Sequence, residues 1–274
     1  MEKVDLTILG ATPGEIARLP GLLPSTGSLE IAGNPFSTHI YRDLKLLIGT
    51  TGLGKVNAAA VAAAALSTFR TSEVWNIGCA GAYSASGLEI GDVLITRNCL
   101  CGDEGILEKN GALPTSTLAI PLVLKDGQPF YDCFPLDEFL SRRQIRDLLP
   151  AAVYTLGPFW SIQSCEPCGT SQRGSAFNVH YGPSLTVGMA SGDTQTAEAR
   201  FRRHGALAEN MEGSAIAQTC LLFGVPFLEF RGISNMAGVR DKAHWDLGAA
   251  LDHCVAAIKL LLDKLQPEVN RGKN

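Results

Sequence analysis

The chain has 274 residues, 46% of them hydrophobic and 18% charged, with a formal net charge of -4. This size and composition suit one large domain or two small ones. The negative charge argues against a nucleic-acid-binding protein, which usually carries a basic patch or stripe. No uninterrupted apolar stretch approaches the roughly 20 residues of a membrane span. A strand-like run also begins at the N-terminus, leaving no room for a signal peptide. We therefore expect a cytoplasmic protein that binds neither nucleic acid nor membranes.

Strand and helix signals alternate along the whole chain. The predicted strands are residues 4–9, 44–48, 74–77, 93–96, 185–189, 208–211 and 225–230. The predicted helices are residues 55–69, 136–149, 194–203, 214–223 and 247–265. No repeat or low-complexity linker interrupts this order. The pattern predicts a single α/β domain over residues 1–274, with three layers and a central mixed, mostly parallel, twisted sheet flanked by helices.

Ligands of such folds bind beyond the carboxyl ends of the strands. Six strand ends here carry small or polar residues, and the fold would collect them at one edge of the sheet. They are residues 10–15, 50–54, 78–81, 191–193, 211–212 and 234–235. The polar segment 169–183 is long for a plain connection, and we expect a loop over the site or at a subunit contact.

The eight cysteines indicate reduced, buried thiols of a cytosolic protein. Cys165 and Cys168 form a lone C-x-x-C pair. A structural zinc site normally takes four protein ligands, and no second pair stands at a familiar zinc-finger spacing. We therefore expect no metal and no cofactor.

Several strand ends carry motifs typical of one enzyme family. They are Gly10-Ala11 followed by Glu15, Thr51-Gly52-Leu53-Gly54-Lys55-Val56, Asn76-Ile77-Gly78-Cys79-Ala80-Gly81, Gly91-Asp92-Val93, Ser191-Gly192-Asp193, Met211-Glu212 and Arg231-Gly232-Ile233-Ser234. With these motifs the chain resembles the nucleoside phosphorylase and nucleosidase superfamily, especially the methylthioadenosine and S-adenosylhomocysteine nucleosidases. The resemblance implies a nucleoside phosphorylase-like fold, a small-molecule nucleoside substrate and a homo-oligomer.

One branch of that superfamily matches further. Asn-Met-Glu-Gly at 210–213, Arg-Gly-Ile-Ser-Asn at 231–235, and Arg240-Asp241 with Trp245 are similar to the futalosine hydrolases of menaquinone biosynthesis. Such enzymes cleave futalosine, an inosine-like nucleoside with a carboxylated aromatic at its 5′ side. The products are hypoxanthine and dehypoxanthinyl futalosine.

The resemblance implies roles for individual residues. Cleavage of the glycosidic bond requires an activated water and a stabilised leaving base. Glu15 matches the group that orients or deprotonates water, and Glu212 matches the group that accepts both ribose hydroxyls. A carboxylate at a helix start is the alternative interpretation of each. The other predicted substrate-binding residues are Gly54, Cys79, Ala80, Gly81, Met211 under the sugar, and Arg231 and Ser234 at the base end.

Asn235 replaces an aspartate of the family pattern. An aspartate can pass a proton to N7 of a 6-aminopurine and accept from its amine, whereas a 6-oxopurine presents acceptors at both N7 and O6. An amide can donate to both acceptors, so Asn235 favours hypoxanthine. The substitution leaves the acid for the leaving base open. Asp241 is a catalytic candidate that could equally pair with Arg240 or Arg231.

Two positions favour water over phosphate as the nucleophile. The phosphorylases of the superfamily place arginines around the phosphate where this chain has Gly14 and Asn76. Gly52 and Gly54 could still cradle an anion. Two alternatives remain open: a nucleosidase or phosphorylase for inosine or methylthioadenosine, and a nucleoside-binding protein without turnover.

The 5′ end of futalosine requires an apolar wall with a cation or a hydrogen-bond donor. The candidates are Arg173, Phe177, His180 and Tyr181, or residues of a neighbouring subunit.

Overall fold

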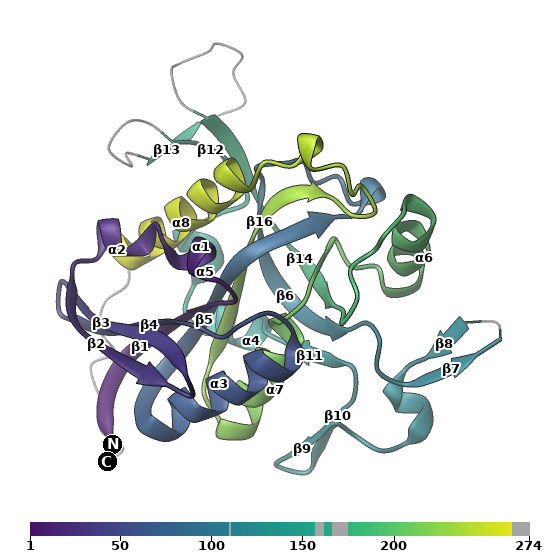
Figure 1. The fold of residues 1–274 in the computed structure, drawn as a ribbon, viewed down its shortest axis with the longest axis horizontal. Helices are drawn as coiled ribbons and strands as arrows, with labels where there is room; N and C mark the ends of the chain where they lie inside the picture. The colour runs from purple at the N-terminus through teal and green to yellow at the C-terminus, as the bar shows by residue number, and fades with distance from the viewer. Residues whose placement is uncertain (110, 157–161, 166–174, 265–274) are drawn as a thin grey trace.

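A 12-stranded mixed sheet forms the centre of the molecule (Figure 1). The structure is a computed structural model that describes residues 1–109, 111–156, 162–165 and 175–264. The strands of this sheet are β1 (Glu2–Gly10), β2 (Ser25–Ile31), β3 (Asn34–Tyr41), β4 (Leu44–Thr50), β5 (Phe69–Ala82), β6 (Val93–Cys101), β11 (Cys133–Pro135), β12 (Val153–Leu156), β13 (Ile162–Cys165), β14 (Ser175–Thr186), β15 (Ala208–Asn210) and β16 (Phe227–Met236).

Parallel pairing is confined to the middle of this sheet. β4, β1, β5 and β16 are parallel neighbours, and β14 runs parallel to β6 and β15. The other pairs, including β6 with β16 and the β2–β3–β4 edge, are antiparallel. The prediction of a mixed α/β sheet is therefore confirmed, with its parallel part at the strands that carry the family motifs.

Helices cover both faces of the sheet. They are α1 (Pro13–Ile16), α2 (Leu19–Leu22), α3 (Lys55–Thr68), α4 (Asp137–Arg142), α5 (Ile145–Leu148), α6 (Thr194–His204), α7 (Gly213–Phe223) and α8 (Leu247–Lys264), with the short 3-10 helices η1 (Ser84–Ser86), η2 (Thr115–Leu118) and η4 (Lys242–His244). Along β16, Gly232 lies against Ala250 of α8, whereas Glu229 lies against Gly213 of α7. Since neighbouring positions of a strand face opposite sides, α8 covers one face, and α7 with its neighbour α3 covers the other (Figure 1).

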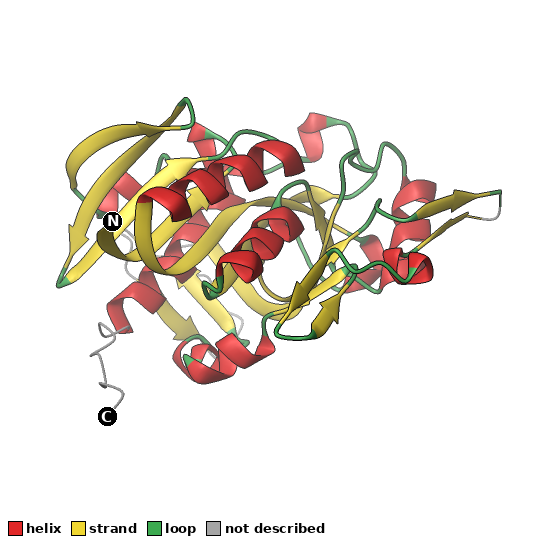
Figure 2. Ribbon diagram, turned by 90° about the horizontal axis from the view of Figure 1, so that it is seen from below, coloured by secondary structure: helices red, strands yellow, loops and turns green. Residues whose placement is uncertain are grey.

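Two hairpins lie outside the sheet. β7 (Ile106–Glu108) pairs with β8 (Gly111–Leu113), and β9 (Val123–Lys125) pairs with β10 (Gln128–Phe130). The β7–β8 hairpin projects from the body in both ribbon views (Figures 1 and 2). None of the described helices is both long and apolar enough to cross a membrane.

Two sequence predictions need correction. The segment predicted as a long loop, 169–183, enters strand β14 at Ser175, and its earlier part lies outside the described residues. The helix predicted over residues 136–149 is two short helices, because Gln144 between α4 and α5 adopts a left-handed conformation with φ 53°. A non-glycine residue in that conformation ends regular α-helix.

A bulge in β16 shapes the edge where the motifs meet. The register with β5 shifts between Ile233 and Asn235, so that Asn235 pairs with Gly81. Bulges of this kind redirect side chains and occur beside active sites. Here the shift brings the side chains of Ser234 and Asn235 together at the same strand end.

Candidate active site

A cavity of about 270 Å³ opens at the carboxyl ends of the central strands. Its lining combines residues from most of the predicted strand ends. They are Ala11, Thr12, Glu15, Leu53, Cys79, Ala80, Gly81, Val187, Ala190, Ser191, Glu209, Asn210, Met211, Glu212, Ser234, Asn235, Gly238, Arg240, Trp245 and Leu247. A larger cavity of about 340 Å³ lies between α4 and α7, but its lining lacks the strand-end carboxylates. We therefore place the candidate active site in the first cavity.

Glu15 is fixed at both carboxylate oxygens. Its Oε2 accepts hydrogen bonds from the backbone N–H of Thr12 (2.9 Å) and from the Thr12 hydroxyl (3.3 Å), and its Oε1 accepts from the backbone N–H of Cys79 (3.1 Å). The first contacts form a capping box at the start of α1. The helix-start and catalytic interpretations are thus compatible. Oε1 keeps a lone pair, and the residue lines the cavity, so a water there can be bound.

Glu212 is held by the backbone around it. Asn210 Oδ1 accepts from the backbone N–H groups of Glu212 (3.1 Å) and Gly213 (2.8 Å), which orders the turn into α7. Glu212 Oε1 accepts from the N–H of Gly54 (2.9 Å). Gly54 has φ 89°, which explains the second glycine of the Thr51–Val56 motif. Burial raises the pKa of Glu212, and the charge of Arg231 and the Gly54 hydrogen bond act against that rise.

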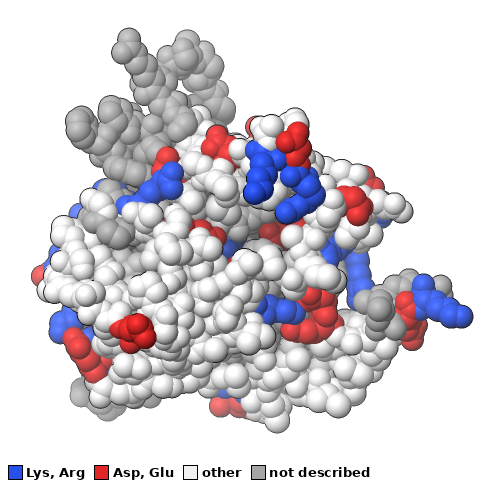
Figure 3. All heavy atoms as spheres, in the orientation of Figure 1, with Lys and Arg blue, Asp and Glu red and all other residues white. Residues whose placement is uncertain are grey.

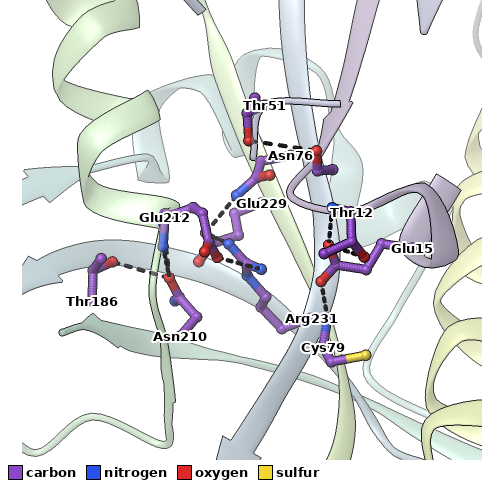
Figure 4. Close-up of polar contacts among 12 residues, drawn as sticks. Thr12, Glu15, Thr51, Asn76, Cys79, Thr186, Asn210, Glu212, Glu229 and Arg231 are labelled. Atoms are coloured by element: carbon purple, nitrogen blue, oxygen red, sulfur yellow. Dashed lines mark hydrogen bonds and ion pairs between the residues drawn. The ribbon is translucent and has the colours of Figure 1, made fainter. Parts of the chain in front are cut away.

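Arg231 is the buried centre of the charged groups. Its side chain is 1% exposed, and Figure 4 shows it between Glu212 and Glu15. Nη2 donates to Glu229 Oε2 at 2.9 Å, and Nη1 lies 3.9 Å from Glu212 Oε2. Burial by itself lowers the pKa of Arg231, but the three neighbouring carboxylates outweigh it and raise the pKa. Gly78 makes this arrangement possible, because a Cβ there would lie 2.6 Å from Nη1 and 2.4 Å from Glu15 Oε1.

Glu229 completes the charged cluster from inside the protein. Oε1 accepts hydrogen bonds from the hydroxyls of Ser184 and Thr96, and Oε2 accepts from the Asn76 amide at 3.2 Å. Burial would raise the pKa of Glu229, but Arg231 and these hydroxyls outweigh burial and lower it. Gly213 must be glycine, since a Cβ there would lie 2.0 Å from Glu229 Oε2.

Ser234 and Asn235 form a neutral polar pair in the cavity lining. Ser234 Oγ donates to Asn235 Oδ1 (2.8 Å), and Asn235 Nδ2 donates to the carbonyl of Met236 (3.0 Å). The amide oxygen is thereby occupied, and one N–H of Nδ2 remains available. Cys79 lines the same cavity, and burial raises the pKa of its thiol to about 12. That thiol is therefore protonated at neutral pH.

A second buried carboxylate, Glu209, lines the cavity. It accepts from the Tyr83 hydroxyl (3.0 Å), from the backbone and side chain of Ser191 (both 2.7 Å), and from Arg200 (3.1 Å). These four donors, one of them the guanidinium of Arg200, occupy both oxygens of this carboxylate, so we assign it to holding the Ser191 segment at the cavity wall.

Comparisons with known proteins agree with this geometry. The family model described as the phosphorylase superfamily matches residues 5–266. This chain belongs to that superfamily. The futalosine hydrolase of Thermus thermophilus is 33% identical over 235 residues, which are 85% of this chain and 89% of that protein.

Solved structures of the superfamily share the fold. A methylthioadenosine/S-adenosylhomocysteine nucleosidase from Colwellia psychrerythraea, in complex with adenine, aligns with a TM-score of 0.74 at 21% identity over 98% of each chain. The futalosine hydrolase of Helicobacter pylori aligns with a TM-score of 0.71 at 19% identity, covering 96% of this chain and 98% of that one. The family resemblance predicted from the motifs is confirmed.

Most predicted residues of this superfamily member meet in the cavity. Those that line it are Glu15, Cys79, Ala80, Gly81, Met211, Glu212, Ser234 and Asn235. Three others do not. Gly54 donates its backbone N–H to Glu212 and is not part of the lining. Arg231 lies behind the cavity carboxylates and not at the base end. Asp241 is exposed. Asp241 caps η4 through the N–H of Ala243 and pairs with His244, which keeps it out of the lining.

The candidates for the 5′ pocket also lie elsewhere. Phe177 stacks on His253, His180 pairs with Asp92, and the Tyr181 hydroxyl donates to the carbonyl of Leu149. None of the three is in the cavity lining. Arg173 lies outside the described residues.

Other predictions have no test in the structure. Among the described residues, no group of three His, Cys, Asp or Glu side chains could hold a metal ion, and Cys168 lies outside that part of the chain. On the face in Figure 3, Lys and Arg are interspersed with Asp and Glu. The homo-oligomer, the cytoplasmic location and the absence of nucleic-acid binding stay predictions.

Proposed function

We propose that this protein hydrolyses the N-glycosidic bond of futalosine, giving hypoxanthine and dehypoxanthinyl futalosine, on the futalosine route to menaquinone. Asn235 carries the proposal. Its Oδ1 accepts from Ser234 and one N–H of Nδ2 is donated to Met236, so the amide has one N–H left for a base in the cavity that it lines. This N–H can be accepted by N7 or by O6 of a 6-oxopurine, whereas the amine beside N7 of adenine is itself a donor. The relative named futalosine hydrolase in Thermus thermophilus supports the same substrate.

The hydrolytic step uses Glu15 and water. A water bound at Glu15 loses a proton to the carboxylate as its oxygen adds to C1′ of the ribose. The bond between C1′ and N9 breaks, and its electron pair leaves with the purine. Asn235 stabilises the resulting negative charge by hydrogen bonding, and solvent supplies the proton that completes hypoxanthine.

The charged cluster stabilises the sugar in the transition state. Glu15, Glu212 and Glu229 surround the single guanidinium of Arg231, which leaves a formal excess of negative charge. An oxocarbenium-like ribose develops positive charge where two of these carboxylates face the cavity. The Glu212 carboxylate accepts one hydrogen bond, from the backbone N–H of Gly54, so its remaining lone pairs can accept from the 2′ and 3′ hydroxyls.

Water is the better nucleophile for this cavity. Asn76, which stands where phosphorylases have a phosphate-binding arginine, donates to Glu229. Gly14 takes the other position and carries no side chain. Phosphate binding favours bidentate cationic donors, and neither position supplies one.

A substrate panel tests the proposal. The protein is incubated with futalosine, inosine and methylthioadenosine, each with and without phosphate, and the free base is followed. The proposal predicts hypoxanthine from futalosine at a rate indifferent to phosphate. Release of adenine as the preferred reaction, or a requirement for phosphate, would contradict it. Binding of futalosine without release of any base would favour the nucleoside-binding alternative.

A further inference from the structure

Arg240 is the cation of the cavity. It follows the turn after β16, and it is the one Lys, Arg or His among the residues that line the cavity in the described part of the chain. Glu15, Glu209 and Glu212 line the same space. A positive charge beside three carboxylates would be expected to pair with one of them.

Arg240 makes no such pair. Within the described ranges it has no carboxylate partner, whereas Arg231 pairs with Glu229 and Arg200 pairs with Glu209. Its neighbour Asp241 is engaged with η4 and His244 instead. The guanidinium of Arg240 therefore keeps its five N–H donors for a ligand.

An aromatic ring holds Arg240 in place. Its guanidinium carbon lies 5.0 Å from the ring centroid of Trp245, within the range of a cation–π interaction. Trp245 is in turn anchored, because its Nε1 donates to the carbonyl of Val239 at 2.9 Å. The cation is thus oriented by a fixed ring and does not depend on a salt bridge.

The cavity around this pair has an apolar rim. Leu53 is 60% exposed and Leu247 is 49% exposed, yet both contribute to the lining. Two exposed leucines, a tryptophan and a guanidinium without a carboxylate partner in one cavity lining suit a ligand group that is flat and apolar and ends in an anion.

We propose that Arg240 and Trp245 form a subsite for an aromatic carboxylate attached to the 5′ side of the nucleoside. This inference rests on the proposed function, in which Glu212 holds the ribose and Asn235 holds the base. The rim with Arg240 is then a third point of attachment, where the ring packs on Trp245 and Leu247 and the carboxylate accepts two N–H donors. It replaces Phe177, His180 and Tyr181 as the candidates.

The decisive variant is Arg240→Gln, and Lys242→Gln is the matched control. Lys242 is an exposed cation two residues away and is absent from the cavity lining. We compare kcat/KM for futalosine, its carboxylate methyl ester and inosine. Arg240→Gln should lower the selectivity for futalosine over inosine about 10- to 100-fold, mainly through KM. Wild type should discriminate against the ester similarly, Arg240→Lys should restore part of the selectivity, and Lys242→Gln should leave it unchanged.

An unchanged selectivity ratio in Arg240→Gln would overturn the subsite, as would an equal loss for all three substrates. A sugar phosphate product whose formation requires Arg240 would also overturn it, because the anion bound there would then be inorganic phosphate.

Failure of the proposed function gives a different result. If wild type releases no base from any nucleoside, the fragment 3-acetylbenzoate still tests the subsite, by ligand-observed NMR with wild type, Arg240→Gln and Lys242→Gln. Binding that is lost only in Arg240→Gln supports the subsite. Binding that is absent in wild type or unchanged in Arg240→Gln contradicts it.

Discussion

Glu212 and Glu229 both contact the guanidinium of Arg231, but they lie in different surroundings (Figure 4). Glu229 is fully buried and accepts from two hydroxyls and an amide besides Arg231. Glu212 lines the cavity and accepts one hydrogen bond, from Gly54. Partners therefore lower the pKa of Glu229, whereas burial raises that of Glu212.

The different surroundings of the two carboxylates predict that Glu229 contributes to folding stability and Glu212 to turnover. Glu229 is the permanent counterion that allows an arginine inside the protein, because an unpaired buried charge is very costly. Glu212 and Glu15 retain free lone pairs toward the cavity and can exchange water for substrate. Changes to the interior carboxylate should act on folding, and changes to the cavity carboxylates should act on turnover.

The largest effect is expected at Glu15. Glu15→Gln removes the base that accepts the water proton, so kcat should fall about 10²- to 10⁴-fold while hypoxanthine still binds. The unfolding midpoint should stay close to that of wild type. Steady-state kinetics and thermal unfolding are the measurements, with the exposed Glu30→Gln as control. Full activity in Glu15→Gln would show that another group activates water.

Glu229→Leu should mainly destabilise the fold. It leaves the charge of Arg231 buried without its nearest partner, which costs about 3–5 kcal/mol. Urea unfolding measures the loss, and the double variant Glu229→Leu with Arg231→Met should recover most of it. A loss below about 1 kcal/mol, the size typical of an exposed ion pair, would contradict the role of Glu229 as the buried counterion of Arg231.

Glu212→Gln should reduce affinity for the sugar. Replacing a charged acceptor by a neutral amide weakens two hydroxyl hydrogen bonds, and kcat/KM should fall about 10- to 100-fold. The penalty should shrink for a 2′,3′-dideoxy nucleoside, which lacks both hydroxyls. Equal penalties for the two substrates would mean that Glu212 does not hold the ribose.

The smallest effect concerns pH, and its sign differs between the two carboxylates. The lowered pKa of Glu229 contributes stability above the unfolded pKa near 4.3, and this is lost as the pH falls through the folded pKa. The raised pKa of Glu212 has the opposite effect on stability. Its contribution to the free energy of unfolding declines as the pH rises past the pKa that Glu212 has in the unfolded chain. Urea unfolding of wild type and Glu212→Gln from about pH 4 to about pH 7 should show their difference shrinking toward acid. A difference that grows toward acid would reverse the assignment.

The sequence could predict part of the cavity because parallel strands end at one edge of the sheet. Glu15 and Asn235 lie at the carboxyl ends of the parallel strands β1 and β16. Glu212 instead follows β15, which pairs antiparallel with β5, and its motif alone predicted its place. The direction of a side chain within a strand is harder to predict. The family resemblance predicts Arg231 at the base end, yet its side chain shares a face of β16 with Glu229 two positions earlier and points into the protein.

Other misses have local causes. Glu229 has no motif, although a glutamate two residues before an arginine in an apolar strand could have indicated a buried pair. Asp241 and Arg240 are neighbours, and the capping of η4 decides which of them reaches the cavity. Phe177 and Tyr181 belong to strand β14, which was predicted as part of a loop because the sequence leading into it is polar.

The most direct test of the central claim is the identity of the sugar product. Futalosine is cleaved by the wild-type protein in phosphate buffer, and the products are identified by mass spectrometry. We predict hypoxanthine together with free dehypoxanthinyl futalosine, in the same yield as without phosphate. A sugar 1-phosphate, or an intact futalosine that stays bound, would contradict the assignment of this protein as a hydrolase.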